Sequence, residues 1–274
     1  MILVNGVEVK IERFPNGETC IRDFEDAILG SHRFEEIVLA YENDQDLMNL
    51  MFIKKHIDAN YNTDVILKMP YMPYSRMDRT EGINVFTLKS VAEMINGLNF
   101  NAVVILEPHS DVTPALVDRC VPIEESVELF KEHVKRGIID EDCYLVFPDA
   151  SADKRYSKIG HKNTLTCIKH RDFETGRIKS LDVFGERPEK PFKAVIIDDL
   201  CSRGGTFMLT GEKLKEMGAT EITLVVTHCE DSIHDGGVLS GDIIDRVITT
   251  NSILKNGTHD KLLVKDVLRD RIRL

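Results

Sequence analysis

The segment "AVIIDDLCSRGGTF" (194–207) joins an apolar run to two adjacent carboxylates and then to a loop with two glycines. Asp198 and Asp199 end the apolar run, where an uncompensated pair of carboxylates is costly to bury. The hydroxyls of a sugar or a bound Mg²⁺ would satisfy that pair, because hydroxyls donate hydrogen bonds and Mg²⁺ prefers oxygen ligands. Residues 202–206 are mostly small and hydroxylated and precede a helical pattern, so their backbone amides could bind phosphate. The alternative is an ordinary turn whose side chains cap the helix.

Polar residues also follow four other apolar runs of the chain. They lie in "PYMPYSRMDR" (70–79), "EPHSD" (107–111), "PDASADKR" (148–155) and "HCED" (228–231). These segments combine carboxylates with basic residues or histidine, a concentration that solvated loops do not need. Ligands of open parallel sheets bind beyond the carboxyl ends of the strands. The pattern therefore predicts one or more ligand sites built from these strand ends.

Apolar runs alternate with helical patterns along the whole chain. The expected strands are 35–41, 63–71, 101–108, 143–149, 194–200, 221–228 and 246–253, and the expected helices are 46–61, 85–98, 125–137 and 205–218. The strands are continuously apolar, as in a parallel sheet covered on both faces. We therefore predict an α/β fold of two similar doubly wound parallel-sheet domains. The expected domains are 1–122 and 123–250, with a tail, 251–274, that packs back on the first domain.

Composition excludes several classes of function. The chain has 274 residues, 42% of them hydrophobic, and a formal net charge of -11. This acidic balance disfavours binding to nucleic acid or to an anionic membrane. We find neither an apolar run long enough to span a membrane nor a secretory pattern in the first residues. The six cysteines are widely spaced, which predicts reduced thiols and a cytoplasmic protein.

An ordered set of segments resembles one enzyme family. The segments are "RFPNGE" (13–18), "PYMPYSRMDR" (70–79), "TLKSVAEMI" (87–95), "EPHSD" (107–111), "FPDASADKR" (147–155), "IKHRDFETG" (168–176), "VIIDDLCSRGGT" (195–206) and "GDIIDRVITTNSI" (241–253). Together they resemble the ribose-phosphate diphosphokinases, or PRPP synthetases, whose domains have the type I phosphoribosyltransferase fold. The resemblance implies that the anomeric hydroxyl of a ribose attacks the β-phosphorus of ATP and that AMP leaves. Such chemistry depends on positioning and charge neutralisation.

The resemblance also implies roles for individual residues. The expected ATP contacts are Phe14, Asn16, Gly17, Glu18, Arg76, Met77 and His109. His109 and Asp149 correspond to ligands of a Mg²⁺ cofactor. Lys169 and Arg171 would be catalytic, on a mobile loop spanning Ile168–Gly176 that closes over ATP. A Lys-His-Arg cluster on its own is usually a solvated surface group, and a histidine after a strand usually has a structural role. The roles of Lys169, Arg171 and His109 therefore rest on the resemblance.

The acceptor and the neighbouring subunit complete the implied site. Asp198 and Asp199 would hold the ribose hydroxyls, and the 5-phosphate would bind Ser202, Arg203, Gly204, Gly205 and Thr206. In the family, the segment like "RFPNGE" reaches the site of a neighbouring subunit. The resemblance therefore implies a homo-oligomer, either a dimer or a hexamer built of dimers.

The phosphate loop departs from the family pattern. The family typically has D-T-G-G-T or D-T-A-G-T, whereas this chain has Ser202 and Arg203 before its glycines. The change removes a negative charge and adds a positive one beside the expected 5-substituent of the acceptor. Extra positive charge suits a diphosphate better than a monophosphate. Ribose 5-phosphate is the expected acceptor, and a 5'-substituted ribose such as ADP-ribose is the alternative. If Arg203 points to solvent, the backbone still binds a monophosphate.

The chain also departs from the family pattern at its N-terminus, in a regulatory element and at several expected ligand contacts. We expect the chain to lack an N-terminal segment of the family. The "DAILG" segment (26–30) replaces an S-x-R-G element, which argues against phosphate-regulated allostery. Asn16 replaces an Asp and Met77 a Gln among the expected ATP contacts. Residues 147–155 lack the paired glycines of the family, which alters the space around the ribose.

Two other classes of function fit parts of the sequence. A phosphoribosyltransferase that consumes PRPP would share the 198–206 loop, but it has no reason to contain "RFPNGE" and "PYSRMDR" in a preceding domain. A non-catalytic regulatory homologue would be expected to lose the basic residues of 168–176, and both Lys169 and Arg171 are present.

Overall fold

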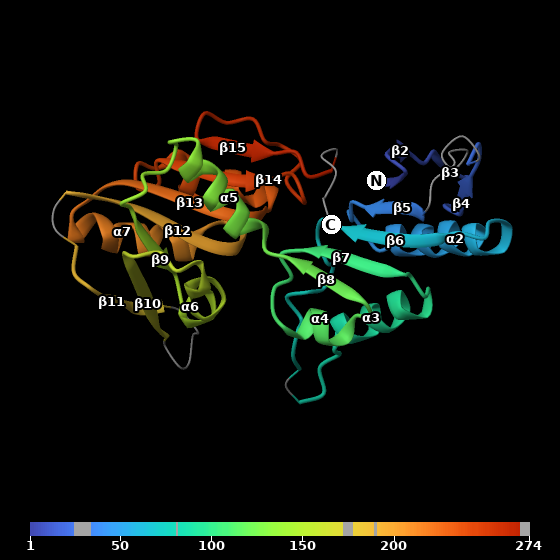
Figure 1. Cartoon of the computed structure of the whole chain (residues 1–274), viewed down its shortest axis with the longest axis horizontal. Helices are drawn as coiled ribbons and strands as arrows, with labels where there is room; N and C mark the ends of the chain where they lie inside the picture. Colours follow the sequence, from blue (N-terminus) through green and yellow to red (C-terminus); the bar gives the residue numbers. More distant parts are fainter. Residues whose placement is uncertain (25–33, 81, 172–177, 189–190, 269–274) are drawn as a thin grey trace. The chain divides into compact units, whose positions relative to one another are not determined.

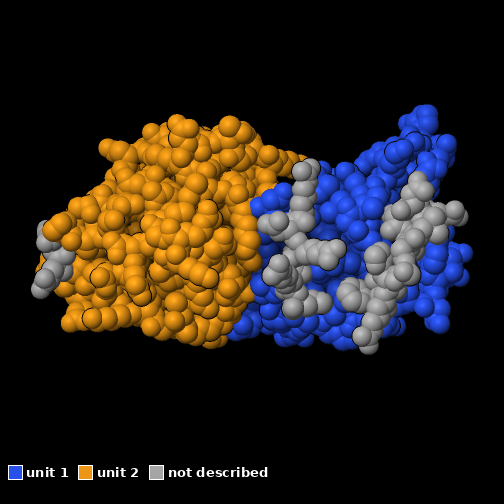
Figure 2. Space-filling model, turned by 45° about the horizontal axis from the view of Figure 1, so that its top comes forward, with its two compact units in different colours: residues 1–123, 266–274 blue, residues 124–265 orange. Residues whose placement is uncertain are grey.

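The computed structural model describes residues 1–24, 34–80, 82–171, 178–188 and 191–268, leaving out the side chains at 34, 170, 171, 178 and 179. These residues divide into two compact units, which Figures 1 and 2 show. Unit 1 comprises residues 1–123 with 266–268, and unit 2 comprises residues 124–265. The units divide one residue beyond the expected boundary. Residues 251–265, expected in the tail, belong to unit 2.

Unit 1 is built on a six-stranded sheet with the order β2-β1-β5-β6-β7-β8. Its strands are β1 (Ile2–Val4), β2 (Val7–Glu8), β5 (Phe34–Leu39), β6 (Asp64–Met69), β7 (Ala102–Leu106) and β8 (Cys120–Ile123). Strands β5 to β8 are parallel, and β1 and β2 add an antiparallel edge. The other elements are the hairpin of β3 (Ile11–Arg13) with β4 (Thr19–Ile21), and the helices α2 (Gln45–Asn60), α3 (Thr87–Gly97) and α4 (Val112–Leu116).

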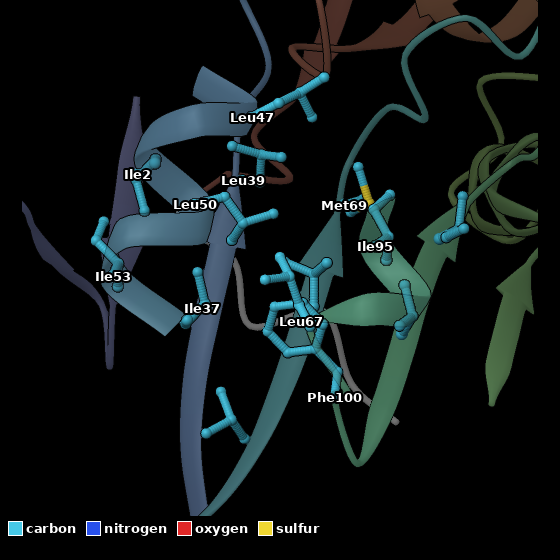
Figure 3. Close-up of a cluster of buried hydrophobic side chains, with 14 of the residues drawn as sticks. Ile2, Ile37, Leu39, Leu47, Leu50, Ile53, Leu67, Met69, Ile95 and Phe100 are labelled. Atoms are coloured by element: carbon cyan, nitrogen blue, oxygen red, sulfur yellow. The ribbon is translucent and has the colours of Figure 1, made fainter. Parts of the chain in front are cut away.

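The core of unit 1 lies between its sheet and its helices (Figure 3). Ile37 and Leu39 of β5 are fully buried, and they share one face because side chains alternate along a strand. Leu50 and Ile53 of α2 belong to the same buried cluster, and so does Ile95 of α3. Leu50 and Ile53 are three positions apart, which places them on one face of α2. This packing fixes the strands whose ends hold the polar segments.

Unit 2 is built on a seven-stranded sheet with the order β11-β10-β9-β12-β13-β14-β15. Its strands are β9 (Tyr144–Phe147), β10 (Thr164–Arg171), β11 (Ile178–Gly185), β12 (Phe192–Cys201), β13 (Ala219–Cys229), β14 (Arg246–Thr250) and β15 (Leu262–Lys265). All pairings are parallel except the one between β10 and β11. Its helices are α5 (Glu125–Lys135), α6 (Ala150–Tyr156), the 3₁₀ turn η1 (Ser157–Ile159), α7 (Gly205–Met217), the 3₁₀ turn η2 (Asp231–Asp235) and α8 (Gly237–Ser240).

Both faces of the second sheet are covered. Ala194 and Ile196 of β12 pack in one buried cluster with residues of α7. Val195 and Ile197 pack in another with residues of α5 and α6. The alternation places each pair on its own face, so β12 is apolar at consecutive positions. The apolar run of β12 therefore holds Asp198 and Asp199 at the carboxyl end of a central, rigid strand.

The predicted fold class is confirmed. All seven expected strands and all four expected helices are present, with small shifts at their ends. The antiparallel edges β1, β2 and β11 were not expected, because each is short or weakly apolar. Within the described residues, none of the helices is both long enough and apolar enough to span a bilayer. The six cysteines are free thiols.

Candidate active site

Lys169 makes the most direct contact between predicted site residues. Its Nζ donates a hydrogen bond of 2.9 Å to Oδ2 of Asp149. Asp149 follows β9 and Lys169 lies in β10, and these strands are parallel neighbours. The Lys169 side chain is only 10% exposed, so its charge is largely shielded from water. An ammonium buried to this extent needs a partner, and the Asp149 carboxylate supplies it.

Asp149 also begins the helix α6. Its Oδ1 accepts hydrogen bonds of 3.0 Å from the backbone N–H groups of Ser151 and Ala152. Burial raises the pKa of the Asp149 carboxyl, but the hydrogen bonds from Lys169 and from the two amides outweigh it. The pKa of Asp149 consequently lies below its ordinary value. This carboxylate is therefore held ionised at the carboxyl end of β9.

The position of Lys169 corrects one expectation. Residues 168–171 were expected in a mobile loop, but they form the end of β10. The reason is that β11 pairs antiparallel with them and satisfies their backbone groups. The Arg171 side chain and residues 172–177 lie outside the described residues, so the predicted roles of Arg171 and of the loop stay predictions.

Asp198 and Asp199 lie at the carboxyl end of β12. Burial raises the pKa of Asp198 well above its ordinary value, and the negative charges of Asp199 and Asp149 raise it further. Within the described part of the chain, none of the cations forms an ion pair with Asp198. Asp199 is 6% exposed, and its Oδ2 lies 4.0 Å from Nη1 of Arg155. The strand end thus brings two carboxyl groups together at a place where burial opposes the ionisation of Asp198.

Residues 202–206 connect β12 to the start of α7. Gly204 has a φ of 76° and directly precedes the first helical residue, Gly205. A Cβ on Gly204 would lie 2.1 Å from Cγ2 of Val238, so both backbone conformation and space require glycine here. The first amides of α7 have no partner within the helix and can bind an anion. Arg203 is exposed and Thr206 is half-buried.

In unit 1, the turn between β3 and β4 holds the first group of predicted ATP contacts. The Phe14 N–H donates to the Glu18 carbonyl at 2.9 Å, and the Gly17 N–H donates to the Phe14 carbonyl at 2.8 Å. The Glu18 N–H donates to the Asn16 side chain at 3.2 Å. Phe14 is 47% exposed, unusually open for an aromatic ring. The turn therefore presents Phe14, Asn16, Gly17 and Glu18 together on one surface projection.

The remaining predicted ATP contacts follow β6 and β7. Arg76 is exposed and Met77 is 43% exposed, both in the turn after β6. His109 is half-buried and follows β7, two residues after Glu107, which is 1% exposed and has a φ of 39°. Strands β6 and β7 are adjacent and parallel, so both turns leave the same edge of the sheet. All predicted ATP contacts thus lie in unit 1, and all predicted acceptor contacts lie in unit 2. The "DAILG" segment (26–30) lies outside the described residues.

The described residues contain no ready-made metal cage. Among them, no group of three or more His, Cys, Asp or Glu side chains is arranged to hold a metal ion. Mg²⁺ in phosphoryl-transfer sites is usually held by one or two carboxylates together with substrate phosphates. Asp149 offers an ionised carboxylate of this type, with one oxygen on two amides and the other on Lys169. The donor set fits a Mg²⁺ that is shared with a bound nucleotide.

Three residues near the site were given no individual role from the sequence. Arg155 approaches Asp199, Ser232 contacts Ser202 of the loop, and Glu230 contacts Ser232 and Cys201. Ser232 reaches Ser202 across thirty positions of sequence, and no local pattern could reveal that pairing. Arg155 lies in the "FPDASADKR" segment, where its charge beside a strand end was the available signal.

Comparison with known proteins gives a consistent match. Residues 2–98 match the model of the N-terminal domain of ribose phosphate pyrophosphokinase. Ribose-phosphate pyrophosphokinase of Staphylococcus epidermidis is 28% identical over 90% of this chain and 79% of its own length. The enzyme of the same name from Aquifex aeolicus is 24% identical over 94% of this chain and 78% of its own length. Over most of its length the chain is therefore similar to ribose-phosphate pyrophosphokinases.

The fold agrees with that family along nearly the whole chain. The crystal structure of phosphoribosylpyrophosphate synthetase from Mycobacterium smegmatis matches with a TM-score of 0.76 and 21% sequence identity. The match covers 95% of this chain and 86% of the crystallised one. Both α/β units therefore have the fold of the pyrophosphokinase family, as the ordered motifs predicted.

Proposed function

We propose that this protein transfers the diphosphoryl group of ATP to the C1 hydroxyl of ribose 5-phosphate, giving PRPP and AMP. The observation that supports it most is the pairing of the shielded Lys169 with Asp149 at the carboxyl edge of the sheet that also holds Asp198 and Asp199. One edge thus combines a cation for phosphate, acceptors for sugar hydroxyls and a helix N-terminus for a second phosphate. The curated relatives bear the name of this activity.

The acceptor would bind across the carboxyl end of β12. Asp198 and Asp199 accept hydrogen bonds from ribose hydroxyls, and this contact relieves the unfavourable burial of their charge. The amides of Gly205 and Thr206 hold the 5-phosphate at the start of α7. These contacts leave the C1 hydroxyl as the free nucleophile. Its oxygen forms a bond to the β-phosphorus, and the bond from that phosphorus to the bridging oxygen of AMP breaks.

Lys169 would neutralise charge on the diphosphoryl group while it is transferred. A cation fixed in a shielded site stabilises developing negative charge strongly, because it does not reorganise during the reaction. The nucleotide would be bound by the predicted contacts of unit 1, with the Phe14 ring against adenine and Arg76 near phosphate. Bound Mg²⁺ would supply further neutralisation of the phosphates, with Asp149 as a protein ligand.

The test is AMP release from ATP and Mg²⁺ with ribose 5-phosphate, ADP-ribose or unphosphorylated ribose as acceptor. We expect AMP with ribose 5-phosphate, and no AMP when Mg²⁺ is removed by chelation. AMP formed only with ADP-ribose would refute ribose 5-phosphate as the acceptor. No AMP with any of the three, from folded protein, would refute the diphosphokinase activity itself.

The exposed Phe14–Glu18 turn supports a homo-oligomer, since an aromatic side chain open to solvent to this degree is suited to a contact with another chain. Light scattering after gel filtration measures the mass directly. A dimer or a hexamer agrees with the proposal, and a monomer at the concentration of the activity assay contradicts it.

A further inference from the structure

The first residue of the phosphate loop is hydrogen-bonded to a side chain of η2. Oγ of Ser202 lies 3.0 Å from Oγ of Ser232. The Ser232 hydroxyl in turn donates a hydrogen bond of 3.0 Å to Oε2 of Glu230. Both serines are half-buried. Glu230, Ser232 and Ser202 therefore form a short relay that ends at the loop.

The relay has only one consistent direction. A serine hydroxyl has one proton to donate, and a carboxylate has none. Because Ser232 gives its proton to Glu230, the hydrogen bond between the serines requires Ser202 to be the donor. Ser202 then offers only lone pairs to a ligand in the loop. A phosphate oxygen needs donors, so Ser202 in this orientation cannot bind it.

The relay is held firmly against the loop. The Glu230 N–H donates a hydrogen bond of 2.9 Å to the Cys201 carbonyl, directly before Ser202. A Cβ on Gly236 would lie 2.1 Å from the Arg203 carbonyl oxygen, which shows how closely the two backbones approach. On its other side, Asp231 accepts hydrogen bonds of 2.9 Å from the backbone amides of Lys255 and Asn256. The segment from Glu230 to Gly236 is therefore tied at both sides.

We propose that Glu230 and Ser232 are specificity-determining residues that fix Ser202 as a hydrogen-bond acceptor and thereby weaken the binding of a phosphate group at the loop. The inference rests on the proposed function for the nature of the loop's ligand. According to this inference, the loop binds phosphate through the backbone amides of 203–206. The Ser202 hydroxyl does not donate to the phosphate, because its proton is engaged in the hydrogen bond to Ser232.

Changing Glu230 to glutamine reverses the relay. The amide of Gln can donate to Ser232, which then donates to Ser202 and frees the Ser202 proton for phosphate. Removing the Ser232 hydroxyl also frees that proton. A hydrogen bond to a charged group contributes about 1.5–3 kcal/mol, which corresponds to roughly tenfold or more in affinity. Both substitutions are therefore expected to strengthen phosphate binding.

The experiment is calorimetric titration with inorganic phosphate and with ribose 5-phosphate at constant pH and salt. We expect Glu230→Gln to bind both roughly tenfold more tightly, and Ser232→Ala several-fold more tightly. Asp235→Asn is the matched control, because it removes one negative charge from the 3₁₀ turn that follows Glu230, at an exposed position outside the relay. Its affinity is expected to stay within about twofold of the original protein.

A double-mutant cycle tests the direction of the relay itself. Ser202→Ala is expected to change phosphate affinity little in the original protein, because its proton is already committed. In the Glu230→Gln background, the same substitution is expected to cost roughly tenfold. A structural role for Glu230 would instead weaken binding, and it would leave the effect of Ser202→Ala equal in both backgrounds.

Unchanged or weaker phosphate binding by Glu230→Gln and Ser232→Ala, relative to Asp235→Asn, would overturn the proposal. Binding to none of the proteins would overturn it as well. Circular dichroism melts verify that each variant is folded, and Ser232→Ala tests the relay if Glu230→Gln does not fold. The titration requires no turnover, so absent AMP release with the expected binding pattern would refute only the reaction.

Discussion

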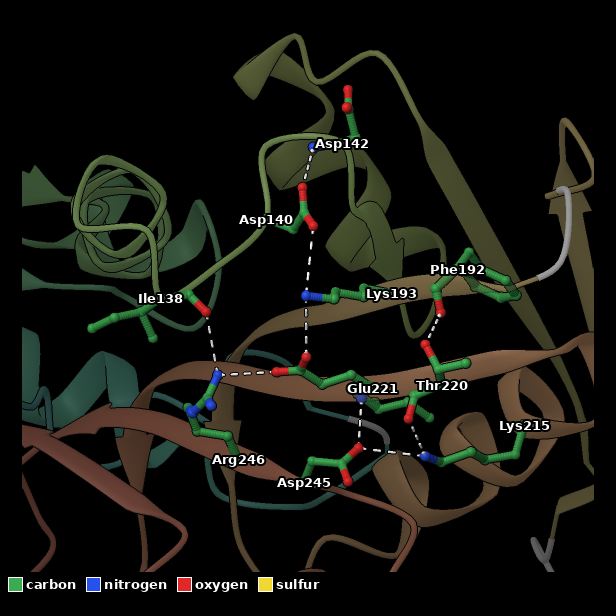
Figure 4. Close-up of polar contacts among 11 residues, drawn as sticks. Ile138, Asp140, Asp142, Phe192, Lys193, Lys215, Thr220, Glu221, Asp245 and Arg246 are labelled. Atoms are coloured by element: carbon green, nitrogen blue, oxygen red, sulfur yellow. Dashed lines mark hydrogen bonds and ion pairs between the residues drawn. The ribbon is translucent and has the colours of Figure 1, made fainter.

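The two edges of the second sheet differ in how their carboxyl groups are paired with cations. At the amino edge, where β12, β13 and β14 begin, Asp140, Glu221 and Asp245 each meet a cation, while Asp142 contributes its backbone amide to the contacts drawn (Figure 4). Glu221 lies 3.5 Å from Nζ of Lys193 and 3.2 Å from Nη1 of Arg246. Asp245 accepts from the Ile222 amide at 2.7 Å and lies 3.4 Å from Nζ of Lys215. The cations of this edge are therefore all paired with its carboxylates.

At the carboxyl edge, two adjacent carboxyl groups follow the apolar run of β12, and burial opposes the ionisation of Asp198. Asp149 is paired with Lys169, Asp199 lies 4.0 Å from Arg155, and Asp198 forms no ion pair within the described residues. Carboxylates in this condition destabilise the protein unless a ligand satisfies them. We infer from this difference that the paired charges at the amino edge stabilise the fold, while the carboxyl groups at the carboxyl edge are available for the proposed binding of the acceptor.

The largest effect is expected from the Lys169–Asp149 pair. Lys169→Ala should lower turnover about 10²- to 10³-fold, because removal of a fixed charge from a shielded site costs about that much. ATP should still bind, since its predicted contacts lie in unit 1. Steady-state AMP release and equilibrium nucleotide binding measure the two quantities.

Lys193→Ala is the matched control, since it removes a lysine from the amino edge of the same sheet. Its turnover should stay within about twofold of the original. Equal turnover losses in the two variants would mean that the edges do not differ in function.

The next effect concerns stability and has an unusual sign. Asp198→Asn should raise the free energy of unfolding at pH 7 by about 1–3 kcal/mol, because it removes a buried carboxylate without a cation. The same variant should lose acceptor binding. Urea denaturation measures the first quantity, and titration with ribose 5-phosphate measures the second. A less stable variant would show that Asp198 is compensated in the free protein.

The pH dependence of stability follows from the same carboxyl. Its pKa is raised in the folded protein, so the folded state keeps a proton that the unfolded state has already released. The free energy of unfolding should therefore fall as the pH rises from the ordinary Asp pKa through the raised one. Asp198→Asn should lack this part of the fall. Denaturation curves recorded between pH 4 and pH 8 would differ in slope between the two proteins, and parallel slopes would contradict the assignment.

The amino edge should respond in the opposite direction. Glu221→Gln should lower the free energy of unfolding by about 0.5–1 kcal/mol, a small value because Glu221 and Arg246 are about one third exposed and Lys193 is about half exposed. Turnover should be unchanged. Urea denaturation beside Asp198→Asn gives two shifts of opposite sign if the comparison holds. A loss of turnover in Glu221→Gln would contradict the functional difference between the two edges.

The smallest effect is expected at Arg203. Its side chain is exposed, and exposed charge pairs contribute at most about 1 kcal/mol. Arg203→Thr should therefore change the ratio of affinities for ADP-ribose and ribose 5-phosphate by no more than about threefold, toward ribose 5-phosphate. Competitive titration measures the ratio. A tenfold change would make Arg203 a principal acceptor contact.

Much of this architecture could be predicted from apolar patterning. The run Ala194–Ile197 is apolar at consecutive positions because helices cover both faces of β12. This pattern can be recognised from the sequence alone. The family resemblance implied a loop at residues 168–171, which form the end of β10. Its strand pairing with β11 depends on partners, not on its own composition. Propensity alone could not reveal it.

The site was predictable where its members are close in sequence or belong to a motif. Asp198, Asp199 and the loop after them follow one strand, and Asp149 begins a helix in the usual way for an Asp. The Lys169–Asp149 contact and the Ser202–Ser232 contact required the sheet order and the close approach of η2 to the loop. Both depend on tertiary packing, which leaves no periodic signal in the sequence.

Thermal denaturation with and without ribose 5-phosphate, at constant Mg²⁺, tests most directly that the carboxyl edge is the acceptor site. At 100 times its dissociation constant the ligand should stabilise the original protein by about 2.7 kcal/mol. Glu221→Gln should gain the same amount, whereas Asp199→Asn should lose most of the gain. Equal stabilisation of all three proteins would contradict the account.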